Sequence, residues 1–137
     1  MGGSPADVVR SFWQSVWTEG QSEKLLDLFA ADATENAEPV DIEQFRRAVD
    51  SWRGIFPDFS ATVEEMFDLG EGRVVTRVTY RGTQTKPWAG LPVSGNTYAG
   101  VGIDIFTVRD GRITELWHAA DHYDMAVQLG GKIAPAD

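Results

Sequence analysis

The first half of the chain carries its apolar residues at helical spacing. Along residues 5–19 they return every three or four positions, which predicts an amphipathic helix with Ser4 as N-cap and Gly20 beyond its end. This stripe consists of Val9, Phe12, Trp13, Val16 and Trp17. A short second helix should follow Ser22. A third should begin after Asp41, whose spacing to Gln44 resembles a capping box, and should stop at Pro57. Residues 31–40 are predicted to form a loop.

From Phe59 onward the apolar period shortens to two, which predicts strands. The expected strands cover 60–69, 73–82, 98–108 and 112–121, and a last helix covers 123–130. "GEG" at 70–72 and the pair Asp110-Gly111 are turn sequences that join neighbouring strands as antiparallel hairpins, while the Pro- and Gly-containing stretch 83–96 is a loop. Helices followed by a meander of strands predict an α+β domain, in which N-terminal helices pack on a curved, mainly antiparallel sheet shaped like a cone.

Length and composition predict one globular domain over residues 1–137. Hydrophobic residues make up 42% of the chain and charged residues 24%, and no internal repeat is visible. No apolar run approaches the roughly 20 residues of a membrane span, and the N-terminus "MGGSPADVV" lacks the pattern of a signal peptide. We therefore expect a cytoplasmic protein with no membrane partner.

Charge and cysteine content exclude several kinds of site and partner. The chain has no cysteine, which excludes disulfides, thiolate nucleophiles and cysteine metal sites. Its formal net charge is −9 and no Lys/Arg cluster stands out, so nucleic acid is not an expected partner. His118 and His122 are the only histidines, and without a clear third ligand they do not predict a metal site.

Aromatic residues are frequent, with five Trp, seven Phe and three Tyr. Two interpretations stay open at this stage: a well-filled core, or a cavity walled by flat side chains that binds a large apolar ligand.

Two aspartates are the main candidates for chemistry. Asp104 lies within the apolar strand sequence "VGIDIF", so its carboxylate should either face a cavity or be paired, for example with an arginine. Asp121 ends the strand that contains His118, and it either faces the cavity or simply caps the last helix. Motifs for nucleotide binding and for serine nucleophiles are absent. Proton transfer by Asp and His in an aromatic cavity remains, because burial raises the pKa of a carboxyl group toward neutrality.

The C-terminal run "DGRITELWHAADHYDMAVQLG" resembles a signature of the SnoaL-like polyketide cyclases, with Asp110, Glu115, Trp117, Asp121 and Gln128 in matching places. "FPDF" at 56–59 and "YRGTQTKPWAGLPVSG" at 80–95 look like central motifs of the same family, although the family often has histidine where this chain has Gln84. The resemblance implies a cone-shaped α+β barrel of the nuclear transport factor 2-like superfamily, usually a homodimer or homotetramer, with no cofactor.

The resemblance also implies a function: ring closure in an apolar, polyketide-like small molecule during natural-product biosynthesis. The family's aldol cyclases use an aspartate at the position of Asp121 to remove a proton next to a carbonyl. His118 would then orient this base or donate a proton, and Asp104 would be the complementary acid. The side chains expected to shape the substrate cavity are Trp13, Trp17, Glu38, Trp52, Phe56, Phe59, Trp88 and Trp117.

Two alternatives remain at the level of sequence. One is an epoxide hydrolase or an epoxide-opening, ether-forming cyclase, in which Asp104 and a second acid such as Asp121 or Glu38 would both be indispensable. The other is a ligand-binding or dimerisation module without catalysis. A cavity filled by side chains, or arginine partners for both Asp104 and Asp121, would favour the module.

Overall fold

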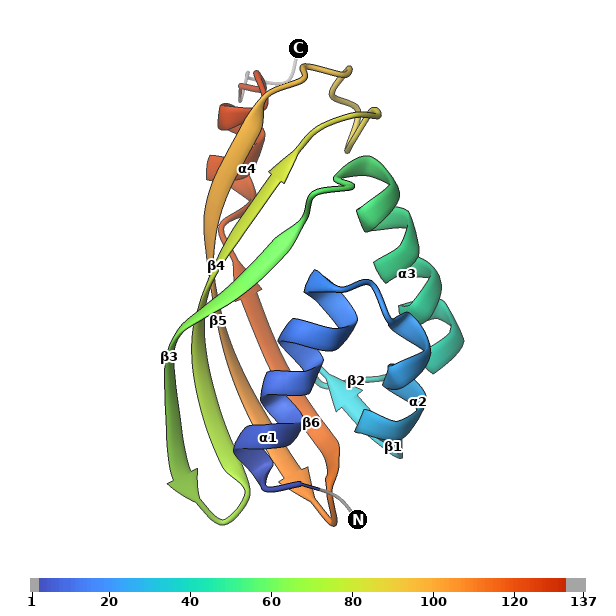
Figure 1. The fold of residues 1–137 in the computed structure, drawn as a ribbon, viewed down its shortest axis with the longest axis vertical. Coiled ribbons are helices and arrows are strands. Elements are labelled where there is room, and N and C mark those ends of the chain that lie inside the picture. The colour runs from blue at the N-terminus through green and yellow to red at the C-terminus, as the bar shows by residue number, and fades with distance from the viewer. Residues whose placement is uncertain (1–2, 133–137) are drawn as a thin grey trace.

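The fold is built on a curved, mostly antiparallel sheet of six strands, with most of the helices on one side of it (Figure 1). The computed structural model describes residues 3–132. The strands are β1 (Phe29–Glu35), β2 (Glu38–Pro39), β3 (Ser60–Gly70), β4 (Arg73–Thr83), β5 (Thr97–Arg109) and β6 (Arg112–Ala120). They lie in the order β2-β1-β6-β5-β4-β3, so β2 and β3 are the two edges. The predicted α+β class and curved sheet are confirmed, and the sheet does not close on itself.

The helical elements that precede β3 cover the concave side of the sheet, whereas the last helix lies beside one end of β5 (Figure 1). They are α1 (Pro5–Ser11), the π-helical turn η1 (Phe12–Thr18), the short 3₁₀ turn η2 (Ser22–Lys24), α2 (Leu25–Leu28), α3 (Ile42–Ile55) and α4 (His122–Gln128). The predicted first helix is therefore one continuous helical segment whose second half is wound more loosely. Its stripe residues Phe12, Trp13 and Val16 are buried, so amphipathic spacing placed the correct face inward.

Local capping and turn chemistry explains where several elements begin and end. Ser4 Oγ accepts a hydrogen bond from the backbone of Asp7, and Asp41 Oδ1 accepts one from the backbone of Gln44. Asp110 and Gly111 have φ angles of 51° and 75°, as a tight two-residue hairpin turn between β5 and β6 requires. These predicted boundaries are confirmed within one or two residues.

The prediction of a loop over residues 31–40 is wrong. β1 extends to Glu35 and pairs with β6 in parallel, and β2 then turns back against β1. A strand was missed here because its side chains are only partly buried and mostly small or polar, so the period of two is weak. This extra pair of strands continues the sheet beyond β6 and brings residues 34–39 next to the predicted site.

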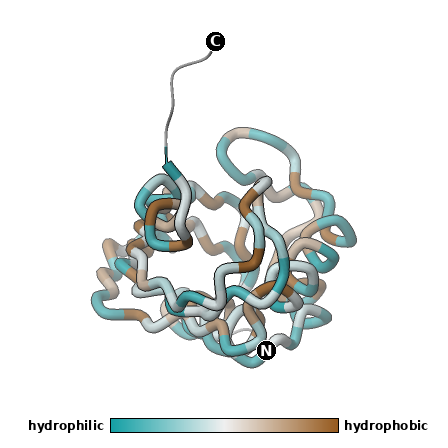
Figure 2. The backbone as a smooth tube through the Cα atoms, turned by 90° about the horizontal axis from the view of Figure 1, so that it is seen from above, coloured by the Kyte–Doolittle hydropathy of each residue, from teal (hydrophilic) through white to brown (hydrophobic). Residues whose placement is uncertain are grey.

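Hydrophobic and hydrophilic residues alternate along the chain rather than forming long apolar segments (Figure 2). Among residues 3–132, no helix is both long and apolar enough to cross a membrane.

Candidate active site

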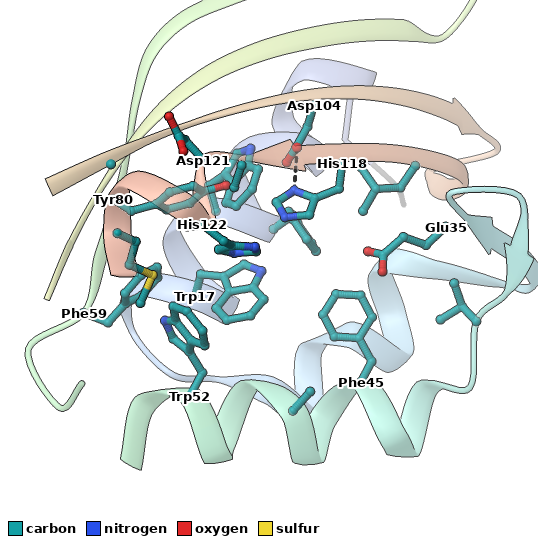
Figure 3. A pocket seen from close by; sticks show the side chains of 18 of the residues that line it. Trp17, Glu35, Phe45, Trp52, Phe59, Tyr80, Asp104, His118, Asp121 and His122 are labelled. Atoms are coloured by element: carbon teal, nitrogen blue, oxygen red, sulfur yellow. Dashed lines mark hydrogen bonds and ion pairs between the residues drawn. The ribbon is translucent and has the colours of Figure 1, made fainter. Parts of the chain in front are cut away.

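A cavity of about 480 Å³ lies between the concave face of the sheet and α3 (Figure 3). Its walls are largely aromatic, and the rings come from η1, α3, β4, β5 and the segment before β3. The aromatic lining residues are Phe12, Trp13, Trp17, Phe45, Trp52, Phe59, Tyr80 and Tyr98. The aromatic residues therefore do both things that the sequence left open: they fill the core and they wall a cavity.

Asp104 and His118 form a hydrogen-bonded pair on the sheet wall of this cavity (Figure 3). They stand directly opposite each other on β5 and β6, and His118 Nδ1 lies 2.7 Å from Asp104 Oδ1. When Asp104 is ionised its carboxylate can only accept, so Nδ1 of His118 then carries the proton. The second ring nitrogen of His118 is then free to act on a ligand, and it points away from Asp104 (Figure 3).

The surroundings of this pair raise the pKa values of both Asp104 and His118. Asp104 is completely buried, and burial raises its pKa, although the hydrogen bond and charge of His118 oppose the rise. Burial by itself lowers the pKa of His118, but the hydrogen bond and charge of Asp104 and the charge of Glu35 outweigh it, so the net shift is upward. Asp104 holds a proton more readily than a free aspartate, and His118 more readily than a free histidine.

Glu35, at the end of β1, is a second carboxylate near His118 (Figure 3). Burial raises its pKa, and the positive charge of His118 opposes this rise. The side chain of the next residue, Asn36, forms hydrogen bonds with both backbone polar groups of His118. Its Oδ1 accepts from His118 N at 2.8 Å, and its Nδ2 donates to His118 O at 3.3 Å. Neither residue was predicted, because their place depends on the missed strand β1.

Two tyrosines with buried hydroxyl groups also belong to the cavity walls. The hydroxyl groups of Tyr80 and Tyr98 have no hydrogen-bond partner among the described residues. Burial raises the pKa of both phenols, so they stay protonated. A side chain at Gly102 would collide with the Tyr80 ring and hydroxyl, so the absence of a side chain there makes room for Tyr80 next to Asp104 on β5.

Asp121 lines the mouth of the cavity, but its carboxylate also has a structural task. Its Oδ1 accepts a hydrogen bond of 2.9 Å from the backbone of Asp124 and so caps α4. His122 begins α4, and its side chain also lines the cavity. Glu38 lies on the short edge strand β2 and contributes to the rim.

The aromatic lining predictions divide into two groups. Trp13, Trp17, Trp52 and Phe59 line the cavity. Phe56 does not, because it is fully buried in the core with its ring 5.3 Å from that of Tyr98. Trp88 lies behind the wall, with its ring 5.9 Å from that of Trp52. Trp117 points to the opposite face of the sheet and is 43% exposed.

Gln84, where the family often has histidine, does not reach the cavity either. It is completely buried and joins its side chain to Lys86, Pro92 and Ser94. It therefore holds the 83–96 loop together. Over residues 3–132, no three His, Asp or Glu side chains are arranged to hold a metal ion.

Comparison with known proteins decides the family. The sequence profile of the SnoaL-like polyketide cyclases matches residues 7–129, which is most of the chain. The chain belongs to the SnoaL-like polyketide cyclase family. No curated protein matches it in sequence. The family membership confirms the interpretation of the C-terminal run and implies a small-molecule, polyketide-type substrate.

Solved structures of this fold include both cyclases and other proteins. IdmH from Streptomyces antibioticus, provisionally described as a polyketide cyclase, is 29% identical, with a TM-score of 0.82 over 94% of this chain and 100% of that one. TsrD from Streptomyces laurentii is 28% identical, with a TM-score of 0.80 over 91% and 93% of the two chains. AclR from Streptomyces galilaeus, provisionally described as a hydroxylase, shares the fold at 17% identity, with a TM-score of 0.79 over 92% and 95%. The fold therefore does not by itself specify a reaction.

Proposed function

We propose that this family member is a cofactor-independent cyclase of natural-product biosynthesis, which closes a ring in a polyketide-like molecule by acid/base catalysis. The observation that carries the proposal is the Asp104–His118 pair: a buried carboxylate that orients an imidazole at the wall of an aromatic cavity. An aspartate in this position fixes the imidazole tautomer and stabilises the imidazolium once it forms.

The proposed reaction is an intramolecular aldol-type closure. The free ring nitrogen of His118 removes a proton from the carbon next to a substrate carbonyl, and the resulting enolate attacks a second carbonyl of the same chain. A carbon–carbon bond forms, and the electron pair of the attacked carbonyl becomes an alkoxide. His118 then returns its proton to this alkoxide, so no external acid, base or redox partner is consumed. Asp104 and Glu35 stabilise the imidazolium between the two steps.

The aromatic walls contribute by holding one folded conformer of the substrate. Tyr80 lies on the same sheet wall as the pair, and its ring helps to shape this wall. Correct placement of the reacting carbons can supply about 7–11 kcal/mol of the barrier, whereas proton transfer by a side chain supplies about 10²–10⁴-fold in rate. We therefore assign most of the rate enhancement to the shape of the cavity.

His118, rather than Asp121, is our choice for the base. The resemblance assigns this role to Asp121, but one of its carboxylate oxygens is used to cap α4 at an exposed position. His118 has a partner that orients it and leaves one ring nitrogen free. Asp121→Asn separates the two assignments, because asparagine caps a helix as well as aspartate but cannot act as a base.

The test measures proton abstraction directly, without knowledge of the natural substrate. 1-Tetralone in D₂O exchanges its α-protons slowly, and NMR follows how the protein accelerates this exchange. We expect acceleration by the wild type, a loss of about 10²-fold or more in His118→Gln, and little change in Asp121→Asn. Loss of exchange in Asp121→Asn with retention in His118→Gln would instead identify Asp121 as the base. No acceleration by the wild type would count against enzymatic proton abstraction.

The two alternatives from the sequence are supported less well. The conditions that would favour a non-catalytic module are not met, since the cavity is open and the partner of Asp104 is a histidine rather than an arginine. An epoxide-opening reaction would need two acids at the reacting atoms. Asp104 is occupied with His118, which fits a base that is oriented by a carboxylate better than a pair of acids.

We also propose that the protein self-associates through the outer face of the sheet. The strand register places four apolar side chains side by side across β3, β4, β5 and β6: Phe67, Val75, Ile105 and Trp117. Phe67 and Trp117 are 52% and 43% exposed. A two-fold axis through such a row would pack it against its own copy and bury it, which is the commonest symmetry of homodimers.

A further inference from the structure

The lining of the cavity is unbalanced in charge. Its acidic lining residues are Glu35, Glu38, Asp41, Asp104 and Asp121, and none of the lysines and arginines of residues 3–132 lines it. Two of the three arginines of α3 are engaged elsewhere: Arg46 pairs with Glu43, and Arg53 donates to the backbone oxygens of Trp17, Phe59 and Pro57. The third, Arg47, is exposed and does not line the cavity. His118 is therefore the main positive group available to these carboxylates.

A second, independent feature points to a ligand in this acidic cavity. Asp104 is completely buried, and its Oδ2 has no hydrogen-bond partner among the described residues. A buried carboxylate oxygen without a partner is costly, and a positive charge held in the cavity beside it lowers that cost. The oxygen itself is not exposed in the cavity, but Asp104 adds negative potential next to the reacting histidine.

The aromatic rings favour the same kind of ligand. The faces of Trp, Tyr and Phe rings attract cations, and a combination of such rings with carboxylates is how proteins bind ammonium groups. Trp17, Trp52 and Phe45 line the cavity opposite the sheet, across from Asp104 and Glu35 (Figure 3). Low-dielectric walls strengthen the negative potential inside the cavity, because field lines are focused there rather than screened by water.

We infer that the cavity selects its substrate by charge: it takes an apolar, ring-forming body that carries a protonated amine, and it excludes bodies that carry a carboxylate or a phosphate. This inference names the substrate class of the proposed cyclase site and rests on that site being the place where substrate binds. The amine of such a substrate must have been introduced by an earlier reaction.

The experiment compares three ligands with one naphthalene body: 2-(1-naphthyl)ethylamine, 2-(1-naphthyl)ethanol and 1-naphthylacetate. Isothermal titration calorimetry at neutral pH and low salt measures their dissociation constants with the full chain. We expect the amine to bind about tenfold more tightly than the alcohol, and the acetate at least about tenfold more weakly than the alcohol. Equal binding of amine and alcohol, or binding of the acetate as tightly as the alcohol, overturns the inference.

Two matched variants decide whether the preference arises in the cavity. Glu35→Gln removes one lining carboxylate, whereas Glu23→Gln removes the same charge from an exposed site outside the cavity. We expect Glu35→Gln to reduce the ratio of amine to alcohol affinity by about threefold or more, and Glu23→Gln to leave it unchanged. Equal reductions would assign the preference to the net charge of the protein and overturn the inference.

These outcomes are separate from those that test the proposed reaction. The binding series uses no turnover, and the exchange assay uses the uncharged 1-tetralone. Exchange without an amine preference would leave the cyclase proposal standing and remove the substrate class. An amine preference without exchange would support the substrate class and count against the proposed proton abstraction.

Discussion

Asp104 should reduce the stability of the fold even though it is central to the site. Its side chain is completely buried, one oxygen is bonded to His118 and the other has no partner among the described residues. We predict that Asp104→Asn raises the free energy of unfolding at pH 8 while abolishing proton exchange. Asparagine has nearly the same shape, keeps an acceptor for His118 Nδ1 and carries no charge.

The magnitude follows from opposing contributions. In Asp104→Asn an amide NH2 replaces the oxygen that has no partner, so the cost of about 1–3 kcal/mol for an unpartnered buried polar group stays. The desolvation cost of the buried charge, several kcal/mol, is removed. Against this, the hydrogen bond to His118 changes from charge-assisted to neutral, which loses about 1 kcal/mol. We expect a net gain of about 1–2 kcal/mol, or roughly 4–8 °C in Tm for a domain of this size.

The gain should depend on pH with a defined sign. The folded pKa of Asp104 is raised, so the stability linked to its protonated form is fully present below the unfolded value of about 4 and is lost as pH rises through the folded pKa. The pKa values of Glu35 and His118 are also raised in the folded protein, so these two groups also make stability fall as pH rises. His118 does so above about pH 6.5. The wild type should thus lose more stability between pH 4 and pH 8 than Asp104→Asn.

Urea denaturation followed by tryptophan fluorescence at several pH values measures both quantities. Asp50→Asn, an exposed substitution on α3, provides the control and should show no gain. If Asp104→Asn were destabilised at pH 8 by more than about 1 kcal/mol, the charge-assisted bond to His118 would outweigh the cost of burial, and our reasoning would be refuted. An unchanged pH slope would refute it as well.

Three further substitutions test other parts of the structure. Asp121→Ala should lower the free energy of unfolding by about 1 kcal/mol in urea denaturation because α4 loses its cap, whereas Asp121→Asn should not; equal values would exclude a capping role. Gly102→Ala should cost about 1–3 kcal/mol by crowding Tyr80, and repeating it in a Tyr80→Phe background should recover part of this loss if the hydroxyl is the obstacle. Trp117→Lys should convert a dimer to a monomer in light scattering after size-exclusion chromatography, without loss of helix or strand in circular dichroism; a dimer that persists would place the interface elsewhere.

The sequence by itself determined most of the local structure. Helix starts at Ser4 and Asp41 and the turn at Asp110-Gly111 depend on hydrogen bonds and φ angles within a few residues, so their chemistry can be read directly from the chain. The periods of the apolar residues, together with the resemblance of the C-terminal run, were sufficient for the fold class and the family. They also singled out Asp104 and His118 as candidates.

The partners of those candidates were decided by the tertiary structure. Glu35 and Asn36 reach His118 only because β1 pairs in parallel with β6, a contact between segments about 80 positions apart. Nothing local marks such a pairing, since a strand of small and polar residues has a weak period and gains its stability from its neighbour. The shared burial that raises the pKa values of Glu35 and Asp104 likewise exists only after these strands meet.

The pairing of Asp104 with His118 shows how sensitive the site is to register. From the turn, Arg109 pairs with Arg112 and Val108 with Ile113, but Thr107 then pairs with Glu115, so Thr114 is bulged out of the ladder. Without this bulge Asp104 would stand opposite Trp117, and His118 would face the other side of the sheet. Because side chains alternate with a period of two, a shift of one residue exchanges the two faces. The sequence contains both Trp117 and His118. Packing of the apolar side chains Ile113 and Leu116 on the inner face decided that His118 is the one opposite Asp104.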